Sequence, residues 1–202
     1  MDSTLHSTPV PDPRDKKKFY FADTSQRRAI VSFIRFIFSL IMEMDEKGLE
    51  HFPEDGPVII AANHVTSFDV FPMQFALPRP ISFMGDAPRR EGVESRLTAR
   101  YVPGGTRSKR RGLSVAKTGT ARLAIEANCP ILPVVVTGSD QFFKRFPRRT
   151  LVQITMLPLL MPNPGENPLA LTDRLMFTLA QALPEELRGV YAEMPNGFEV
   201  PI

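Results

Sequence analysis

The sequence predicts an α/β fold, a mixed, partly parallel sheet flanked by helices, with an apolar, amphipathic helix near the N-terminus. Beyond that helix, short apolar runs typical of buried strands alternate with segments of helical periodicity, the order expected of a partly parallel sheet. The chain has 202 residues and is 43% hydrophobic, enough to bury one sizeable core. A single cysteine, Cys129, excludes an internal disulfide. We therefore expect one α/β domain over residues 46–202.

Two segments precede this domain. Residues 1–25 are rich in proline and charge and predict a flexible basic arm. Residues 26–45 predict a helix with a narrow polar stripe, because polar residues recur at steps of three or four along an apolar segment: Arg28, Ser32, Arg35, Ser39 and Glu43. Its apolar part, about 14 residues or about 21 Å at ~1.5 Å per residue, is too short for the ~30 Å hydrocarbon layer.

Two interpretations of the helix over residues 26–45 stay open. In the first, it packs on the core of the domain. In the second, it lies on an anionic membrane surface with nearby basic residues among the headgroups, namely Lys16, Lys17, Lys18, Arg27 and Arg28. The second interpretation predicts a monotopic or peripheral protein at the cytoplasmic face of a membrane.

Within the domain, four apolar runs predict strands: "GPVIIAAN", "PISFMG", "PILPVVVTG" and "TLVQITMLPLLM". Helical periodicity predicts one helix at "AKTGTARLAIEAN", ending at Asn128, and a closing helix at "LTDRLMFTLAQAL", with Thr172 as N-cap. A further helix is expected to begin near Asp69, with Thr66 or Ser67 as its cap.

The segment "NHVTSFD" places a histidine and a carboxylate beside the end of the first predicted strand of the domain. Ligands of open α/β sheets collect at the carboxyl ends of strands. If the loop folds back, Asp69 contacts one ring nitrogen of His64 and leaves the other nitrogen to accept a proton, as a general base requires. In the alternative reading the two side chains never meet, and the spacing alone does not decide between them.

Three segments in order, "NHVTSFD", "VPGGTRSKRRG" and "AKTGTARLAIEANCPILPVVVTG", resemble the glycerophospholipid acyltransferase family, in particular the bacterial 1-acylglycerol-3-phosphate acyltransferases. The family signature is Asn-His, four residues and Asp, followed by Pro-Glu-Gly-Thr-Arg-Ser. The resemblance runs from about residue 26 to about residue 192. It implies an enzyme of phospholipid synthesis that moves a fatty acyl group from a thioester donor to the free hydroxyl of a lysophospholipid.

The resemblance also implies roles for individual residues. His64 would take the proton of the acceptor hydroxyl, and Asp69 would orient and charge-stabilise His64, without an acyl-enzyme. The implied substrate-binding residues are Asn63, Gly105, Thr106, Arg107 and Lys117. An arginine grips phosphate with a planar fork. In the alternative reading, Arg107 only opens the solvated run "RSKRR" and Lys117 is a helix-start charge.

The implied partners are a lysophospholipid acceptor, an acyl thioester donor and an anionic membrane surface. Acyl-CoA or acyl-carrier protein would act as co-substrate, and we expect no cofactor and no metal. A nucleic-acid binder using "RSKRRG" and "FKRFPRR" is the alternative from another class. Because the apolar N-terminal helix favours lipid, no nucleic acid is expected.

Two departures from the family pattern bear on activity. Gly104 stands where the signature has Glu, and the stretch over residues 86–102 is much shorter than the corresponding block of the family. That block normally carries an arginine-bearing glycerol-phosphate motif. We therefore expect an acyltransferase weakened by an internal deletion, or, as the alternative, a non-catalytic membrane-surface lipid binder descended from the family.

Overall fold

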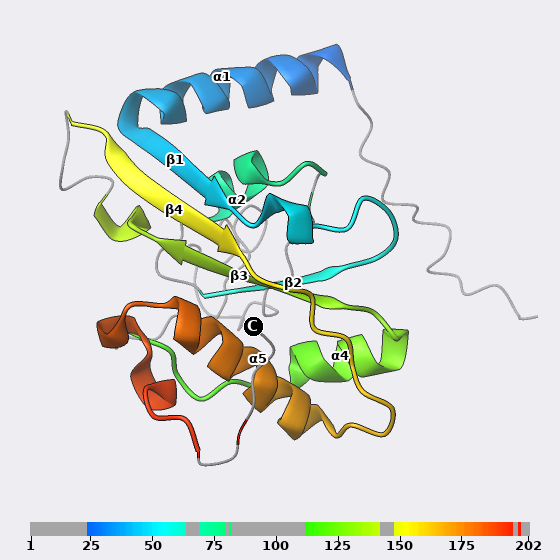
Figure 1. Ribbon diagram of the computed structural model, residues 1–202. Helices are drawn as coiled ribbons and strands as arrows, with labels where there is room; N and C mark the ends of the chain where they lie inside the picture. Colours follow the sequence, from blue (N-terminus) through cyan, green and yellow to red (C-terminus); the bar gives the residue numbers. More distant parts are fainter. Residues whose placement is uncertain are drawn as a thin grey trace, which may run out of the picture. The chain divides into compact units, whose positions relative to one another are not determined.

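The computed structural model describes residues 24–63, 69–79, 81, 112–141, 148–195 and 198. In these residues the chain forms a four-stranded sheet with the strand order β1-β4-β3-β2 (Figure 1). The strands are β1 (Met42–Lys47), β2 (Ile59–Ala62), β3 (Ile131–Thr137) and β4 (Thr150–Met156). The pairs β1–β4 and β2–β3 are parallel, and β3–β4 is antiparallel. The predicted mixed, partly parallel sheet is confirmed.

Four α-helices accompany the sheet in the described ranges: α1 (Ser25–Ile41), α2 (Val70–Ala76), α4 (Gly119–Ala127) and α5 (Pro168–Ala182). Short 3-10 helices lie between or after these elements, at Leu49–His51, Ser139–Gln141, Glu185–Leu187 and Gly189–Tyr191. Figure 1 shows α4 and α5 beneath the sheet, and their apolar residues form one core cluster with side chains of β3. Residues of α2 form a second cluster with β3 and β4. The sheet therefore carries helices on both faces.

The strand β3 lies at the centre of both clusters. Ile131 and Val135 pack with α4 and α5, whereas Leu132, Val134 and Val136 pack with α2. Successive side chains of a strand point to opposite faces, so a strand that is buried on both faces needs apolar residues at every position. The continuous run "ILPVVV" meets this requirement, which is why the sequence predicted this strand correctly.

The strand β1 was not predicted. The helix expected over residues 26–45 ends at Ile41, and Glu43, the last residue of its predicted polar stripe, lies in β1 instead. Met42 and Met44 of this strand contribute to the core, while four of its six residues are charged. Charged side chains are common on edge strands, where they oppose pairing with other chains. They also hide the apolar alternation on which strand prediction depends.

The two long predicted helices of the domain are present. The first, α4, ends as predicted, with Asn128 in the left-handed conformation (φ 46°). For α5 the predicted N-cap was wrong: Asn167 is the N-cap, and its side chain accepts a hydrogen bond of 2.8 Å from the backbone N–H of Ala170. Thr172 lies inside the helix, where its hydroxyl donates to the carbonyl of Pro168. Asn followed by Pro at the first helical position was the stronger start signal.

Some predictions fall outside the described residues. These include residues 1–23 of the predicted arm and, apart from Ile81, the predicted strand "PISFMG". Ile81 itself belongs to no strand.

Candidate active site

Asn63 fixes the start of the "NHVTSFD" segment. It directly follows β2 and is 7% exposed. Its side-chain Oδ1 accepts a hydrogen bond of 2.7 Å from the backbone N–H of Val136, and its Nδ2 donates to the carbonyl of the same residue at 2.8 Å. The amide therefore continues the pairing of β2 with β3 by one more step after the backbone ladder ends. A buried amide held by two hydrogen bonds fixes the point at which the chain leaves the sheet.

Asp69 ends the same segment at the beginning of α2. It occupies the N-cap position, with Val70 as the first helical residue, and it is only 2% exposed. Its side chain makes no capping hydrogen bond to the helix. The helix start expected near Asp69 is confirmed, but the N-cap is Asp69 itself rather than Thr66 or Ser67, which lie outside the described residues. A buried charge needs a partner, and Asp69 does not use the N-terminus of its own helix as that partner.

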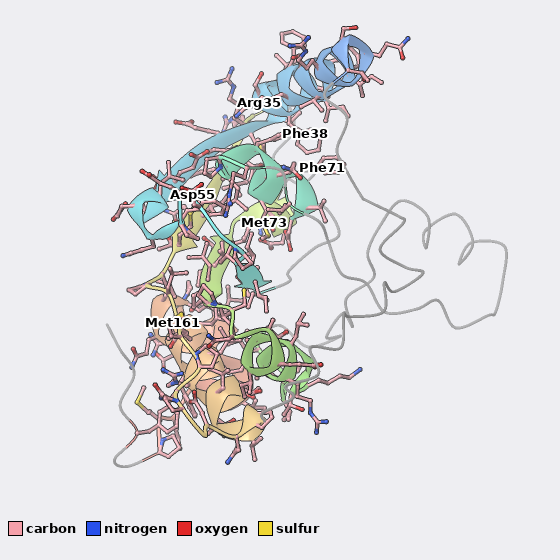
Figure 2. All side chains as sticks on the ribbon, turned by 90° about the vertical axis from the view of Figure 1, so that its right-hand side faces the viewer. Arg35, Phe38, Asp55, Phe71, Met73 and Met161 are labelled. Atoms are coloured by element: carbon pink, nitrogen blue, oxygen red, sulfur yellow. The ribbon has the colours of Figure 1, made fainter. Side chains whose placement is uncertain are left out.

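The helix α2 is held by aromatic packing on its first turns. The ring of Phe38 stacks on Phe71, with ring centroids 4.6 Å apart, and meets Phe75 edge-on at 5.8 Å. Figure 2 labels Phe38 beside Phe71. Met73 and Ala76 of α2 are buried in the core cluster shared with β3 and β4. Because Phe71 lies two residues after Asp69, this packing also fixes the position of the carboxylate-bearing residue.

The remaining predicted site residues are distributed as follows. Lys117 is exposed and precedes Thr118, the N-cap of α4. His64, Gly105, Thr106 and Arg107 lie outside the described residues, so the predicted contact between His64 and Asp69 stays a prediction. The contacts of Asn63 assign it a structural role at the end of β2, and its contact with substrate also stays a prediction.

Sequence reasoning missed two features near this edge of the sheet. The first is the aromatic packing of Phe38 on α2, which no pattern in the sequence predicts. The second is Ser139, a buried serine one residue beyond Gly138 at the end of β3. The signal for it was the glycine directly after the largely apolar strand β3, since a glycine at the end of a strand often marks a turn.

Comparison with known proteins agrees with this arrangement. A family model described as Acyltransferase matches residues 43–93 and 90–137. Human 1-acyl-sn-glycerol-3-phosphate acyltransferase alpha is 26% identical over 215 residues, which cover 84% of this chain and 75% of the relative. The sheep relative with the same description is also 26% identical over 215 residues, covering 84% of this chain and 74% of the relative.

A solved structure gives the fold neighbour. The 1-acyl-sn-glycerophosphate (LPA) acyltransferase PlsC from Thermotoga maritima matches with a TM-score of 0.56 at 19% sequence identity, covering 77% of each chain. At this identity the likeness shows the fold. The mixed sheet flanked by helices, with Asn63 directly after β2 and Asp69 directly before α2, agrees with this fold. The family model, the relatives and the fold neighbour agree: this chain is similar to acyltransferases in sequence and in fold.

Proposed function

We propose that this protein transfers a fatty acyl group from a thioester donor to the free hydroxyl of a 1-acylglycerol-3-phosphate. The observation that supports this most directly is the way the structure holds both ends of "NHVTSFD". Asn63 is bound to Val136, and Asp69 is buried at the start of α2. The acyltransferase names of the relatives and of the fold neighbour support the same chemistry.

In this mechanism the chain's own residues hold and move one proton. As the acceptor oxygen attacks the carbonyl carbon of the thioester, His64 takes the proton of the hydroxyl. Asp69 fixes the tautomer of His64 and stabilises its positive charge. When the carbon–sulfur bond breaks, the departing thiolate receives the proton from His64. The donor is an acyl-CoA or an acyl-carrier protein, and no cofactor or metal takes part.

The helix α1 is proposed to place the enzyme on an anionic membrane at its cytoplasmic face. Among the described helices, none is both long and apolar enough to cross a membrane. Six apolar side chains of α1 are exposed, with Phe33 the most open at 65%; the others are Ile30, Val31, Phe36, Ile37 and Leu40. Arg28 and Arg35 alternate with them along the helix. Exposed apolar residues combined with basic ones are typical of helices that lie in the plane of an anionic membrane surface.

The acceptor site is proposed to be reduced. The aligned stretch with the human relative is 215 residues long, whereas 84% of this chain of 202 residues is about 170 residues. About 45 aligned positions therefore have no residue here. The two parts of the family-model match meet at residues 90–93, inside the stretch that is short in this sequence. A loss at this place removes the block that carries the arginine motif of the family.

The test is acyl transfer from a radiolabelled thioester to lysophosphatidate by the purified full chain in detergent micelles. The expected product is phosphatidate, formed by the wild-type chain and lost in His64→Ala. Acyl-CoA and acyl-carrier protein are offered separately to identify the donor. A chain that binds vesicles but forms no product with either donor would instead be the non-catalytic lipid binder.

A further inference from the structure

The hydroxyl of Ser139 is buried and makes no hydrogen bond to the residues that the structure describes. The residue is 2% exposed, and in the described part of the chain its Oγ is the buried side-chain oxygen or nitrogen that has no hydrogen-bond partner. Other buried hydroxyls have partners: Thr150 donates to Gln141, Thr172 to Pro168 and Thr178 to Arg174. A buried polar group without a partner in the protein lowers stability, so such a group calls for an explanation, and a contact with a ligand is one.

The backbone around Ser139 is fixed. Gly138 has a φ of 85°, and a Cβ there would collide with the carbonyl oxygen of Leu151. Gln141 N–H donates to the carbonyl of Gly138 at 3.1 Å, and the hydroxyl of Thr150 donates to the carbonyl of Gln141 at 3.3 Å. These contacts attach the short helix Ser139–Gln141 to the start of β4. A group on such a rigid support is well suited to precise contact with a ligand.

The position of Ser139 relates it to the candidate active site. The strands β2 and β3 are parallel, so both end at the same edge of the sheet. Val136, three residues before Ser139, makes both hydrogen bonds to Asn63, and His64 follows Asn63 directly in the chain. Because ligands of α/β sheets bind at this edge, the unused hydroxyl of Ser139 lies on the side of the sheet where the proposed reaction takes place.

We propose that the hydroxyl of Ser139 donates a hydrogen bond to the carbonyl oxygen of the acyl thioester. This inference rests on the proposed function. When the acceptor oxygen bonds to the carbonyl carbon, the electron pair of the carbonyl moves onto its oxygen, and the hydrogen bond from Ser139 strengthens. The carbonyl re-forms as the carbon–sulfur bond breaks, and Ser139 keeps its proton throughout. Donors that are in place before the reaction are effective at stabilising such an oxyanion.

Asp69 is unsuited to this task, and Asn63 is held in place by Val136. An ionised carboxylate accepts hydrogen bonds and would repel the oxyanion. The Oδ1 and one N–H of Asn63 are used by Val136. A neutral hydroxyl donor also leaves His64 free to handle the proton of the acceptor.

The first experiment compares Ser139→Ala with the wild-type chain in steady-state kinetics and thermal unfolding. Both transfer to lysophosphatidate and hydrolysis of the thioester are followed, since both reactions form the oxyanion. We expect kcat to fall by about 10²–10³-fold, the loss typical of one oxyanion donor, with little change in KM. The midpoint of unfolding should stay unchanged or rise, because the lost hydroxyl had no partner in the protein.

Thr172→Val serves as the matched control. Thr172 is 3% exposed, close to the 2% of Ser139, but its hydroxyl donates to Pro168 within α5. We expect this variant to unfold at a lower temperature and to keep the wild-type kcat. If Ser139→Ala instead loses stability or fails to fold, or keeps the wild-type kcat, its hydroxyl has a structural role and the inference is overturned.

A binding measurement separates this inference from the proposed function. Two unreactive acyl-CoA analogues are used: a ketone, in which CH₂ replaces the sulfur, and a thioether, in which CH₂ replaces the carbonyl. The wild-type chain should bind the ketone more tightly, by about two- to tenfold for one hydrogen bond, and Ser139→Ala should bind both alike. If this binding pattern is found but no acyl transfer is detected, the contact with Ser139 is supported and the proposed reaction is contradicted. The contact is overturned if the wild type and Ser139→Ala prefer the ketone over the thioether to the same degree. It is also overturned if the wild type binds neither analogue.

Discussion

The side chain of Asn63 makes both of its hydrogen bonds, of 2.7 and 2.8 Å, to the backbone of a single residue, Val136. This contact connects the start of the "NHVTSFD" segment to the most buried strand of the sheet. The asparagine thereby holds the chain in place one residue before the proposed general base.

Asn63→Ala should therefore reduce both stability and turnover. The substitution leaves the N–H and the carbonyl of Val136 without these partners, at a cost of about 1–3 kcal/mol for each buried group. Chemical denaturation measures the loss of stability, and kcat measures how far the reaction depends on this contact. Asn167→Ala is the control: it removes the cap of α5 at a cost of about 1 kcal/mol and should leave kcat unchanged. Equal kinetic losses in both variants would mean that kcat only reports stability.

Phe38 should act as a positioning residue for Asp69. Phe38→Ala removes the ring that stacks on Phe71, which should lower the free energy of unfolding and let the start of α2 shift. Small displacements of positioned groups can reduce rates by up to ~10²-fold. Phe38→Leu keeps part of the packing and should lie between the alanine variant and the wild type in kcat.

The control for Phe38 is Phe33→Ala, which truncates an exposed ring of α1. It should leave both the unfolding transition and kcat in detergent unchanged. A Phe38→Ala variant with lowered stability and wild-type kcat would show that the aromatic packing supports the fold without setting the position of Asp69.

The proposed dyad is tested by His64→Ala and Asp69→Asn. Loss of a general base costs typically ~10²–10⁴-fold in rate, and the asparagine should impair the reaction by favouring the wrong tautomer of His64. The rates are measured for thioester hydrolysis as well as for acyl transfer, since both need proton abstraction. Wild-type rates in both variants would exclude the dyad.

Membrane binding is expected to depend on the apolar side chains of α1. Ile30→Ser combined with Phe33→Ser should weaken sedimentation with phosphatidylglycerol vesicles, since exposed apolar surface drives insertion into the interface. Substitution is preferable to truncation through residue 42, because Met42 is buried in a core cluster and Phe38 packs against that cluster. High salt should weaken binding further by screening the arginines. If the folded variant sediments with the vesicles as strongly as the wild type does, α1 is not the membrane anchor.

Prediction from sequence succeeded where one physical requirement dominated. The strand β3 is buried on both faces, and α4 ends at an asparagine in the left-handed conformation, so both left clear patterns. The strand β1 was not predicted, because four of its six residues are charged and its apolar residues form too short an alternating pattern. The contact between Asn63 and Val136 was not predicted, because the two residues are 73 positions apart in the chain. Contacts of this kind depend on which strands pair, so the spacing of nearby residues in the sequence does not predict them.

The last prediction is that acyl transfer is weak because of the acceptor site, while the base remains competent. The segment "NHVTSFD" is complete and both its ends are held, so proton abstraction should proceed. About 45 positions aligned with the human relative are missing, and Gly104 replaces the glutamate of the second signature. Adjacent glycines enlarge the conformational freedom that must be lost when the segment binds acceptor. Slow hydrolysis of the thioester, dependent on His64, should therefore exceed transfer to lysophosphatidate. Gly104→Glu alone should change this ratio little, because it does not restore the missing block. Efficient, saturable transfer by the unmodified chain would contradict this reasoning, and arginine variants at 89, 90, 96 and 100 would then locate the replacement phosphate contact.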